Sequence, residues 1–259
     1  MKSHILEEAS WSHLEKTKIK VAILPWGATE AHNYHLPYGT DTILANQIAG
    51  RAAALANKKG ASAIVLPPIA YGVNSGQIEV KLCMNLNPST QMSILQDILF
   101  VLESHNIDKL IIVNGHGGNM FQPIIRELSL EYPDTIMCCV NWWKICNEKE
   151  FFENPGDHAG ELETSCMQYL APHLTDPLNT AGEGKENKMK IAAFREKWAW
   201  TPRRWIMITD DTGVGDPSLA SAEKGEKFIE CCIEKLAQFI IDLSKTKTEE
   251  DLYENSNLD

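Results

Sequence analysis

The sequence lacks the cysteine spacing of a structural zinc knuckle, because none of its seven cysteines forms a Cys-x-x-Cys pair. Two adjacent pairs, Cys138–Cys139 and Cys231–Cys232, lie in apolar runs, which indicates buried, reduced thiols of a cytoplasmic protein. It also has no apolar run of about 18 residues, the length that a membrane helix needs. The polar, acidic N-terminal stretch has no signal-peptide core. We therefore expect a cytoplasmic protein that does not span a membrane.

Positive charge is scarce as well: the chain has 24 Lys and Arg residues against 35 Asp and Glu residues, which gives a net charge of −11. This balance argues against a nucleic-acid partner and against binding to an anionic membrane. The Gly-x-Ser-x-Gly motif of serine hydrolases is absent, and no cysteine lies in a polar motif suited to a thiol hydrolase. The 259 residues, 44% of them hydrophobic, suffice for one large domain with a sizeable core.

Short apolar runs alternate with helix-like segments along the first half of the chain. We expect strands over residues 20–26, 62–66, 110–113 and 135–140, and helices over 41–58, 90–105, 119–131, 161–170 and 219–244. The alternation predicts a three-layer α/β/α fold with a mostly parallel sheet. Residues 173–218 show no assignable pattern. We expect a single domain over residues 1–245 and a polar, solvated tail over 246–259.

Chemistry-bearing residues gather first in GATEAHNYHLPYGTD, residues 27–41, between the first strand and the next helix. Its side chains Glu30, His32, His35 and Asp41 combine imidazole with carboxylate, which suits zinc, manganese or iron. Two of them have a plainer interpretation, because Asp41 could be only a helix cap and His35 only a loop residue. The segment alone therefore leaves metal binding and a structural role both open.

Two further polar motifs follow at places where a parallel sheet gathers its ligands. NGHGGN, residues 114–119, is a glycine-rich turn that offers His116; it lacks the spacing of phosphate-binding loops, although an anion nest stays an alternative. GDHAGELETS, residues 156–165, offers Asp157, His158, Glu161 and Glu163. Together the three motifs supply more ligands than one ion needs. They therefore favour a pair of metal ions bridged by a carboxylate.

The three motifs, in this order, resemble those of the creatininase (creatinine amidohydrolase) family. GVGDPSLASAEKG, residues 213–225, is similar to the C-terminal signature of that family, and the resemblance covers roughly residues 20–235. It implies a creatininase-like fold and two divalent metal ions per chain, zinc first, with manganese or iron as alternatives. It also implies hydrolysis of carbon–nitrogen bonds other than peptide bonds in a small molecule, and a homo-oligomer, for which the creatininase hexamer is one candidate.

Carried over residue by residue, the resemblance implies that Glu30 and His116 bind one metal ion. His32 binds the other, and Asp41 bridges the two. Creatininase has a further ligand, a glutamate two residues after the histidine of its NGH turn, where this chain has Gly118.

We expect the side chain missing at Gly118 to be replaced by Glu163, with Glu161 as the second candidate. The resemblance further implies that His158 shuttles protons, and we expect Asp157 to orient its ring.

In the first motif, Asn33-Tyr34 replaces the usual Gly-Pro of the family. Two further departures bear on the substrate. Gly117 stands where creatininase has a tyrosine. Many relatives read YGxSxxHxxFPGT after the second strand, whereas residues 71–90 here read YGVNSGQIEVKLCMNLNPST. The pocket is therefore not expected to be built for creatinine, and the chain resembles NGHGGN-type relatives, which include a formamide hydrolase and a peptidase. A non-catalytic metal- or ligand-binding homologue is the alternative function.

Overall fold

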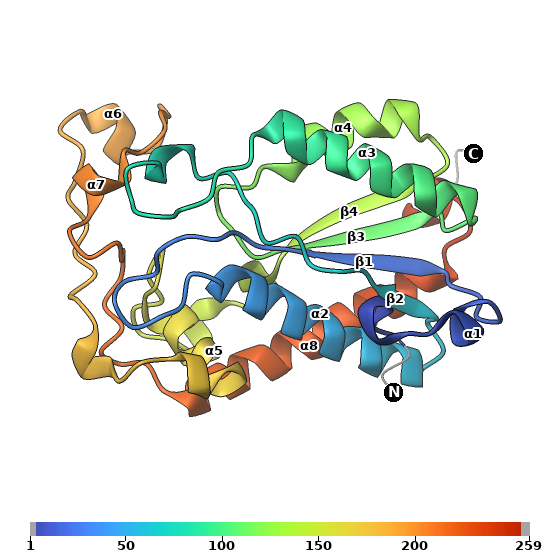
Figure 1. Cartoon of the computed structure of the whole chain (residues 1–259), viewed down its shortest axis with the longest axis horizontal. Helices are drawn as coiled ribbons and strands as arrows, with labels where there is room; N and C mark the ends of the chain where they lie inside the picture. The colour runs from blue at the N-terminus through green and yellow to red at the C-terminus, as the bar shows by residue number, and fades with distance from the viewer. Residues whose placement is uncertain (1–3, 255–259) are drawn as a thin grey trace.

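The computed structural model describes residues 4–254 and places a parallel sheet between two layers of helices (Figure 1). The strands pair in the order β2-β1-β3-β4, every pair being parallel. Their bounds are β1 Val21–Trp26, β2 Ala63–Val65, β3 Lys109–Asn114 and β4 Ile136–Asn141. The predicted three-layer α/β/α fold is confirmed.

Both faces of the sheet are covered by helices because the strand residues that point to either face are apolar. Val21 and Ile23 of β1 belong to one hydrophobic core, and Ala22 and Leu24 to the other. The first core contains residues of α2 Thr40–Lys58, α5 Glu161–Leu170 and α8 Ala222–Lys245, and the second those of α3 Pro88–Ser104 and α4 Phe121–Glu131. Alanines dominate the buried face of α2, which lets this helix pack closely on both β1 and α8.

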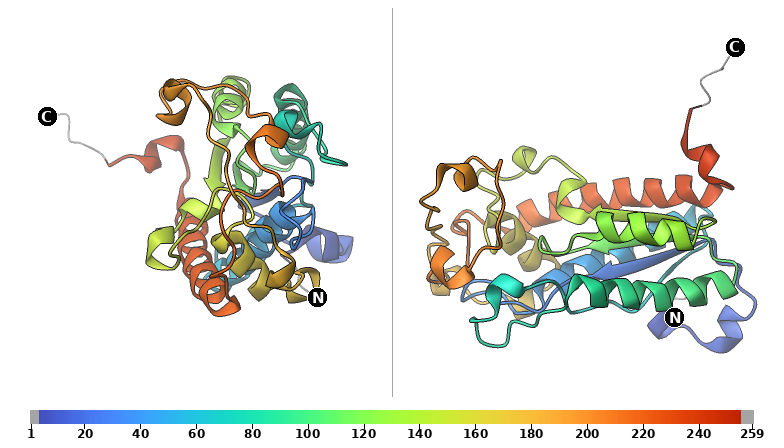
Figure 2. Two further views of the ribbon diagram at one scale, coloured as in Figure 1. Left: turned by 90° about the vertical axis from the view of Figure 1, so that its left-hand side faces the viewer. Right: turned by 90° about the horizontal axis from the view of Figure 1, so that it is seen from above.

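The segment predicted to be irregular, residues 173–218, contains only short helices and lies beyond the carboxyl ends of the strands, at the left of Figure 1. Seen from that end, in the left view of Figure 2, it crosses in front of the sheet. Its helices are η5 Pro172–Leu174, η6 Leu178–Thr180, α6 Ala192–Arg195 and α7 Trp205–Ile208. The other short elements are η1 Leu6–Glu8, α1 Trp11–Leu14, η2 Ser75–Gln77, η3 Trp142–Lys144, η4 Glu148–Glu150 and η7 Glu249–Leu252.

The cysteines correct one prediction. Cys231 is not a reduced thiol, because it forms a disulfide with Cys146. Its neighbour Cys232 is free and buried, since adjacent helical residues point about 100° apart. Cys138 and Cys139 are free as predicted but only half buried, on opposite faces of β4. Because disulfides are rare in the reducing cytoplasm, this pairing weakens the cysteine argument for a cytoplasmic location.

The last described helix, η7, follows α8, and a capping box formed by Thr248 and Asp251 caps its N-terminus. It belongs to the predicted tail, of which residues 255–259 lie outside the described part of the chain. Within residues 4–254, no helix has both the length and the apolar character that crossing a membrane requires.

Candidate metal centre

The polar motifs meet where β1 and β3 lie side by side and their following helices cover opposite faces of the sheet, the usual place for a ligand in such folds. The Gly115 backbone N–H donates to the Trp26 carbonyl at 2.8 Å, which joins the ends of the two strands. A Cβ at Gly115 would lie 2.4 Å from the Asp41 carbonyl oxygen. Only glycine therefore lets the NGHGGN turn come this close to the start of α2.

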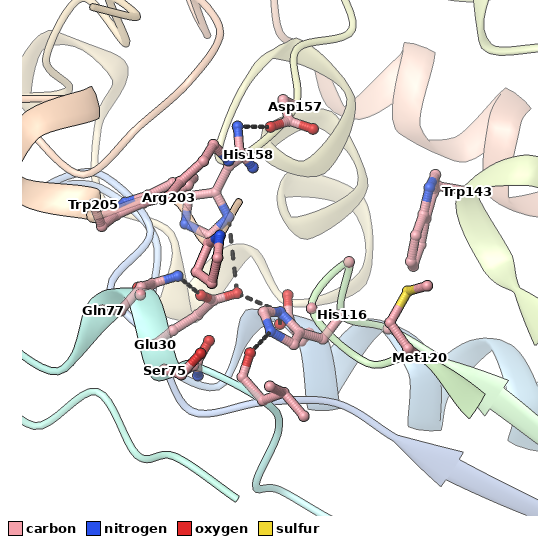
Figure 3. A pocket seen from close by; sticks show the side chains of 18 of the residues that line it. Glu30, Ser75, Gln77, His116, Met120, Trp143, Asp157, His158, Arg203 and Trp205 are labelled. Carbon is pink, nitrogen blue, oxygen red and sulfur yellow. Dashed lines mark hydrogen bonds and ion pairs between the residues drawn. The ribbon is translucent and has the colours of Figure 1, made fainter. Parts of the chain in front are cut away.

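Glu30, Asp41 and His116 form one candidate ligand group. Figure 3 shows Glu30 and His116 joined by a dashed line. His116 Nδ1 lies 2.7 Å from Glu30 Oε1 and 3.1 Å from Asp41 Oδ2. His116 Nε2 points away, 3.1 Å from the Val73 carbonyl oxygen, which fixes the orientation of the ring. Each of these side chains is at most 8% exposed, so the carboxylates are shielded from bulk water.

His32, Asp41 and Glu163 form a second group, and Asp41 belongs to both. His32 Nε2 lies 3.0 Å from Asp41 Oδ1 and 4.0 Å from Glu163 Oε2. The other ring nitrogen of His32 is held 3.0 Å from the Glu30 carbonyl oxygen. The two oxygens of Asp41 therefore face different histidines, which is the arrangement expected of a bridging carboxylate.

The two glutamates of α5 have separate environments, although both were candidates for the ligand missing at Gly118. Glu163 Oε2 faces the centre and accepts a hydrogen bond from the Ala159 N–H at 2.6 Å. Glu161 is fully buried elsewhere, where its oxygens accept from Lys224 Nζ at 2.6 Å and from the Asn154 N–H at 2.8 Å. Their spacing of two residues on a helix puts them on different faces. Of the two, only Glu163 belongs to a candidate ligand group, with His32 and Asp41.

Gly118 itself has no room for a side chain. A Cβ there would lie 2.3 Å from the Val73 carbonyl oxygen and 2.4 Å from His116 Nε2. A carboxylate at this position would require the turn to move. The glutamate of creatininase is thus excluded by the local backbone of this chain, whereas a Cβ at Gly117 would meet nothing within 4 Å.

His158 lies against the centre, but Asp157 does not orient it as predicted. His158 Nε2 is 2.8 Å from the Ala31 carbonyl oxygen, and its Nδ1 is 3.8 Å from Glu30 Oε1. The Asp157 carboxylate instead accepts a hydrogen bond from Arg203 at 2.8 Å. The chain bends at Asp157, and the two adjacent side chains therefore have different partners. His158 also forms a third candidate ligand group with Glu30 and His32.

His35 belongs to none of these ligand groups. This agrees with its interpretation as a loop residue. Its Nε2 is 2.8 Å from Thr164 Oγ1, and it is 1% exposed. Burial, together with the neighbouring His32, lowers the pKa of His35 to about 4, so the ring is neutral at neutral pH. His35 therefore ties the first motif to α5.

Asn33, one of the departures from the family pattern, has a backbone role. Its φ of 55° is left-handed, a conformation that glycine and asparagine tolerate best. Its side chain accepts from the Gly182 N–H at 2.8 Å, and its own N–H donates to Thr212 Oγ1 at 2.9 Å. Asn33 therefore anchors the irregular segment over the centre.

Gln77 is a site residue that the motifs did not reveal. It is 6% exposed, and its amide N–H donates to Glu30 Oε2. Its amide oxygen accepts from Cys83 Sγ at 3.4 Å. Gln77 stands at the position of the histidine in the relatives' YGxSxxHxxFPGT pattern, counted from Tyr71-Gly72, and this offset could have identified it.

The buried charges alter the protonation of the histidines. Burial lowers the pKa of His32, but Asp41, Glu163 and Glu30 outweigh it and raise that pKa to about 10. For His116, burial is likewise outweighed by Glu30 and Asp41, so its pKa is raised well above the ordinary value. Burial acts against ionisation of Asp41 too, yet the two histidines hold its pKa below the usual range. The metal-free centre is therefore charged, with two imidazolium rings among carboxylates.

Loading the metal-free protein with zinc at neutral pH is expected to release about one proton for each of these two histidines, because only neutral imidazole binds a metal. The apparent affinity should fall as the pH falls, by about tenfold per unit for each proton displaced. Titration in weak buffer with an indicator dye measures the release. Zinc uptake without proton release would show that these histidines are not ligands.

The donor set fits divalent metal ions rather than an anion. Within the described residues, Asp41 Oδ2 is buried and accepts no hydrogen bond, although His116 Nδ1 lies 3.1 Å away. Carboxylates and imidazoles together match zinc, manganese or iron. The carboxylates around His116 disfavour phosphate, which argues against the anion-nest interpretation of NGHGGN. The groups open into a cavity of about 710 Å³.

Comparisons with known proteins agree with this geometry. Residues 7–240 match the family model described as "Creatininase: Creatinine amidohydrolase". A mycofactocin precursor peptide peptidase of Mycobacterium ulcerans (strain Agy99) is 28% identical over 232 residues, 84% of this chain and 84% of that protein. The family name and this relative's name describe different activities, so the similarity alone selects no substrate.

Solved structures share the fold. One, provisionally named a creatinine amidohydrolase, from Bacteroides fragilis NCTC 9343, has a TM-score of 0.92 and 42% identity, and the match covers 98% of this chain and 100% of that one. A mutant creatininase of Zn–Zn type has a TM-score of 0.77 and 25% identity, and covers 93% of this chain and 98% of its own.

Proposed function

The chain belongs to the creatininase family, and we propose that it is a metal-dependent amidohydrolase that uses a dinuclear centre to cleave an amide, cyclic amide or formamide bond of a small molecule. The observation that supports this most is Asp41, whose two oxygens face the two histidines of separate ligand groups. A carboxylate shared in this way is typical of two-metal hydrolytic sites.

Glu30 and His116 would hold one metal ion, His32 and Glu163 the other, and Asp41 both. Zinc is the first candidate, which the Zn–Zn type of a related mutant creatininase supports, with manganese or iron as alternatives. Such ions supply Lewis-acid chemistry when bound: they lower the pKa of a water and polarise a carbonyl group.

The surrounding residues orient these ligands. Gln77 holds one oxygen of Glu30, so the other oxygen faces His116. The Val73 carbonyl fixes the ring of His116, and the Glu30 carbonyl fixes that of His32. Partners of this kind keep each ligand atom aimed at its metal and affect affinity by about 10–100-fold.

We assign to His158 the donation of a proton to the leaving nitrogen. Its ring lies against that of His32 with centroids 4.1 Å apart, and it makes an edge contact with Trp205 at 5.3 Å. It lines the same cavity as Glu30 and Asp41. A proton donor at this position would face a substrate in the cavity, and His158 is only 8% exposed to bulk water.

A screen of amides, cyclic amides and formamides against zinc-loaded and manganese-loaded protein tests this function. We expect metal-dependent hydrolysis of at least one class. His158→Gln should lower kcat by about 10²–10⁴-fold, the usual contribution of a general acid, with unchanged metal content. A fall in metal content of this variant would instead make His158 a ligand.

A non-catalytic metal- or ligand-binding homologue is the second candidate, and Gly118 favours it because it cannot carry the glutamate of creatininase. Fully loaded protein that hydrolyses none of the compounds would support that role.

A further inference from the structure

Arg203 is the only lysine or arginine among the described residues that line the cavity. Among the lining residues, the side chains of Glu30, Asp41 and His116 are at most 8% exposed, whereas that of Arg203 is 40% exposed. The residues that line the cavity also include Trp143, Glu148, Asp157 and Trp200. A substrate that fills this cavity therefore meets one positive side chain at a distance from the centre.

The position of Arg203 is fixed relative to the proposed proton donor (Figure 3). Its guanidinium lies over the ring of Trp205, 4.8 Å from the centroid. Trp205 in turn contacts His158 edge-on, and its Nε1 donates to the Thr212 carbonyl at 3.0 Å. The stack Arg203–Trp205–His158 thus sets where a group bound by Arg203 lies relative to the reacting bond.

The guanidinium is only partly used by the protein. One nitrogen, Nη1, donates to Asp157 at 2.8 Å and lies 3.9 Å from Glu186. Both carboxylate side chains are about half exposed, 57% and 46% respectively, so water can replace them as partners. The remaining donors of the planar fork match the two oxygens of a carboxylate.

We propose that Arg203 binds a carboxylate of the substrate, which would make the substrate an amide that carries an acidic group. This inference rests on the proposed function, since the same molecule must place its carbonyl at the metal centre. Asp157 holds the guanidinium in the absence of substrate and gives way to the substrate carboxylate. Arg203 is then a specificity-determining residue.

Hydroxamates that end in a carboxylate provide the probe, because a hydroxamate chelates a metal centre without being turned over. Calorimetry with the zinc-loaded protein would compare a series of chain lengths with the matching carboxamides and with the matching amines. At the best length, the carboxylate should bind about tenfold more tightly than the carboxamide, as expected for a charge-assisted hydrogen bond.

Arg203→Met, which keeps an unbranched stem over Trp205, should abolish this preference, and Arg203→Lys should retain part of it. Asp157→Asn should increase it, because a competing carboxylate is removed. Arg204→Met is the matched control: Arg204 pairs with Glu79 at the surface, 63% exposed, and its loss should leave the preference unchanged.

Equal binding of carboxylate and carboxamide by the wild type would overturn the proposal. If the amine bound most tightly, this part of the cavity would be a site for a cation, and the proposal would be wrong. It would also be wrong if Arg203→Met weakened the binding of the carboxylate and the carboxamide equally, because Arg203 would then have only a structural role. If no hydroxamate binds the zinc-loaded protein, the metal centre of the proposed function fails together with this inference.

Discussion

Asp41→Asn is expected to lower the affinity for both metal ions and to reduce hydrolysis by about a thousandfold or more, beyond the 10–100-fold that loss of an orienting partner costs. The reason is that Asp41 is the one residue shared by the two ligand groups. An amide retains the shape of the side chain but offers one poor ligand oxygen and no charge. Zinc titration of the variant and steady-state kinetics with the best compound of the screen measure the effect.

The control for Asp41→Asn is His35→Gln. His35 comes from the same sequence motif and is equally buried, 1% exposed, but its ring bonds to Thr164 instead of a candidate ligand. This variant should keep both ions and lose only stability, by about 1–3 kcal/mol for a broken buried hydrogen bond. An Asp41→Asn protein that binds two ions as tightly as the wild type would exclude a bridging role.

Glu163→Gln is expected to bind one metal ion tightly instead of two and to lose most of its activity. Glu163 is the carboxylate nearest to His32 apart from Asp41, and Gly118 cannot supply a substitute. The Glu30–His116 group does not include Glu163, so the ion held there should remain. Zinc titration with a competing chelator resolves the two affinities.

Glu161→Gln is the matched control, the same substitution two residues away. Glu161 pairs with Lys224 rather than with the centre, and the side chain of Lys224 is 29% exposed. Water can therefore solvate the lysine that is left, and we expect a loss of stability on the order of 1–2 kcal/mol with full metal content. If Glu161→Gln loses a metal ion and Glu163→Gln does not, the roles of the two glutamates are reversed.

Local sequence patterns were sufficient to predict the layers of the fold. The expected helix over 161–170 coincides with α5, and the strand expected over 110–113 extends by one residue at either end in β3. Apolar periodicity reports burial directly, which explains this agreement. The irregular segment has no such periodicity to be recognised. Its conformation depends on contacts with distant residues, such as those of Asn33 with residues 182 and 212.

The candidate site was predicted in part. Glu30, His32, Asp41, His116 and Glu163 come from motifs and converge in the structure. Contacts between distant segments were not predictable: Asp157 pairs with Arg203, 46 residues away, rather than with the adjacent His158. The Cys146–Cys231 disulfide, with a sequence separation of 85, is a further example. Such pairs depend on tertiary proximity, of which a single sequence gives no local sign.

Elemental analysis of the wild-type protein, purified without chelator and compared with Glu163→Ala, tests the central claim most directly. The dinuclear centre predicts close to two divalent metal ions per chain in the wild type and about one in the variant. One ion or none in the wild type would contradict it, because Gly118 would then leave the second site incomplete, and a binding function would replace the hydrolytic one.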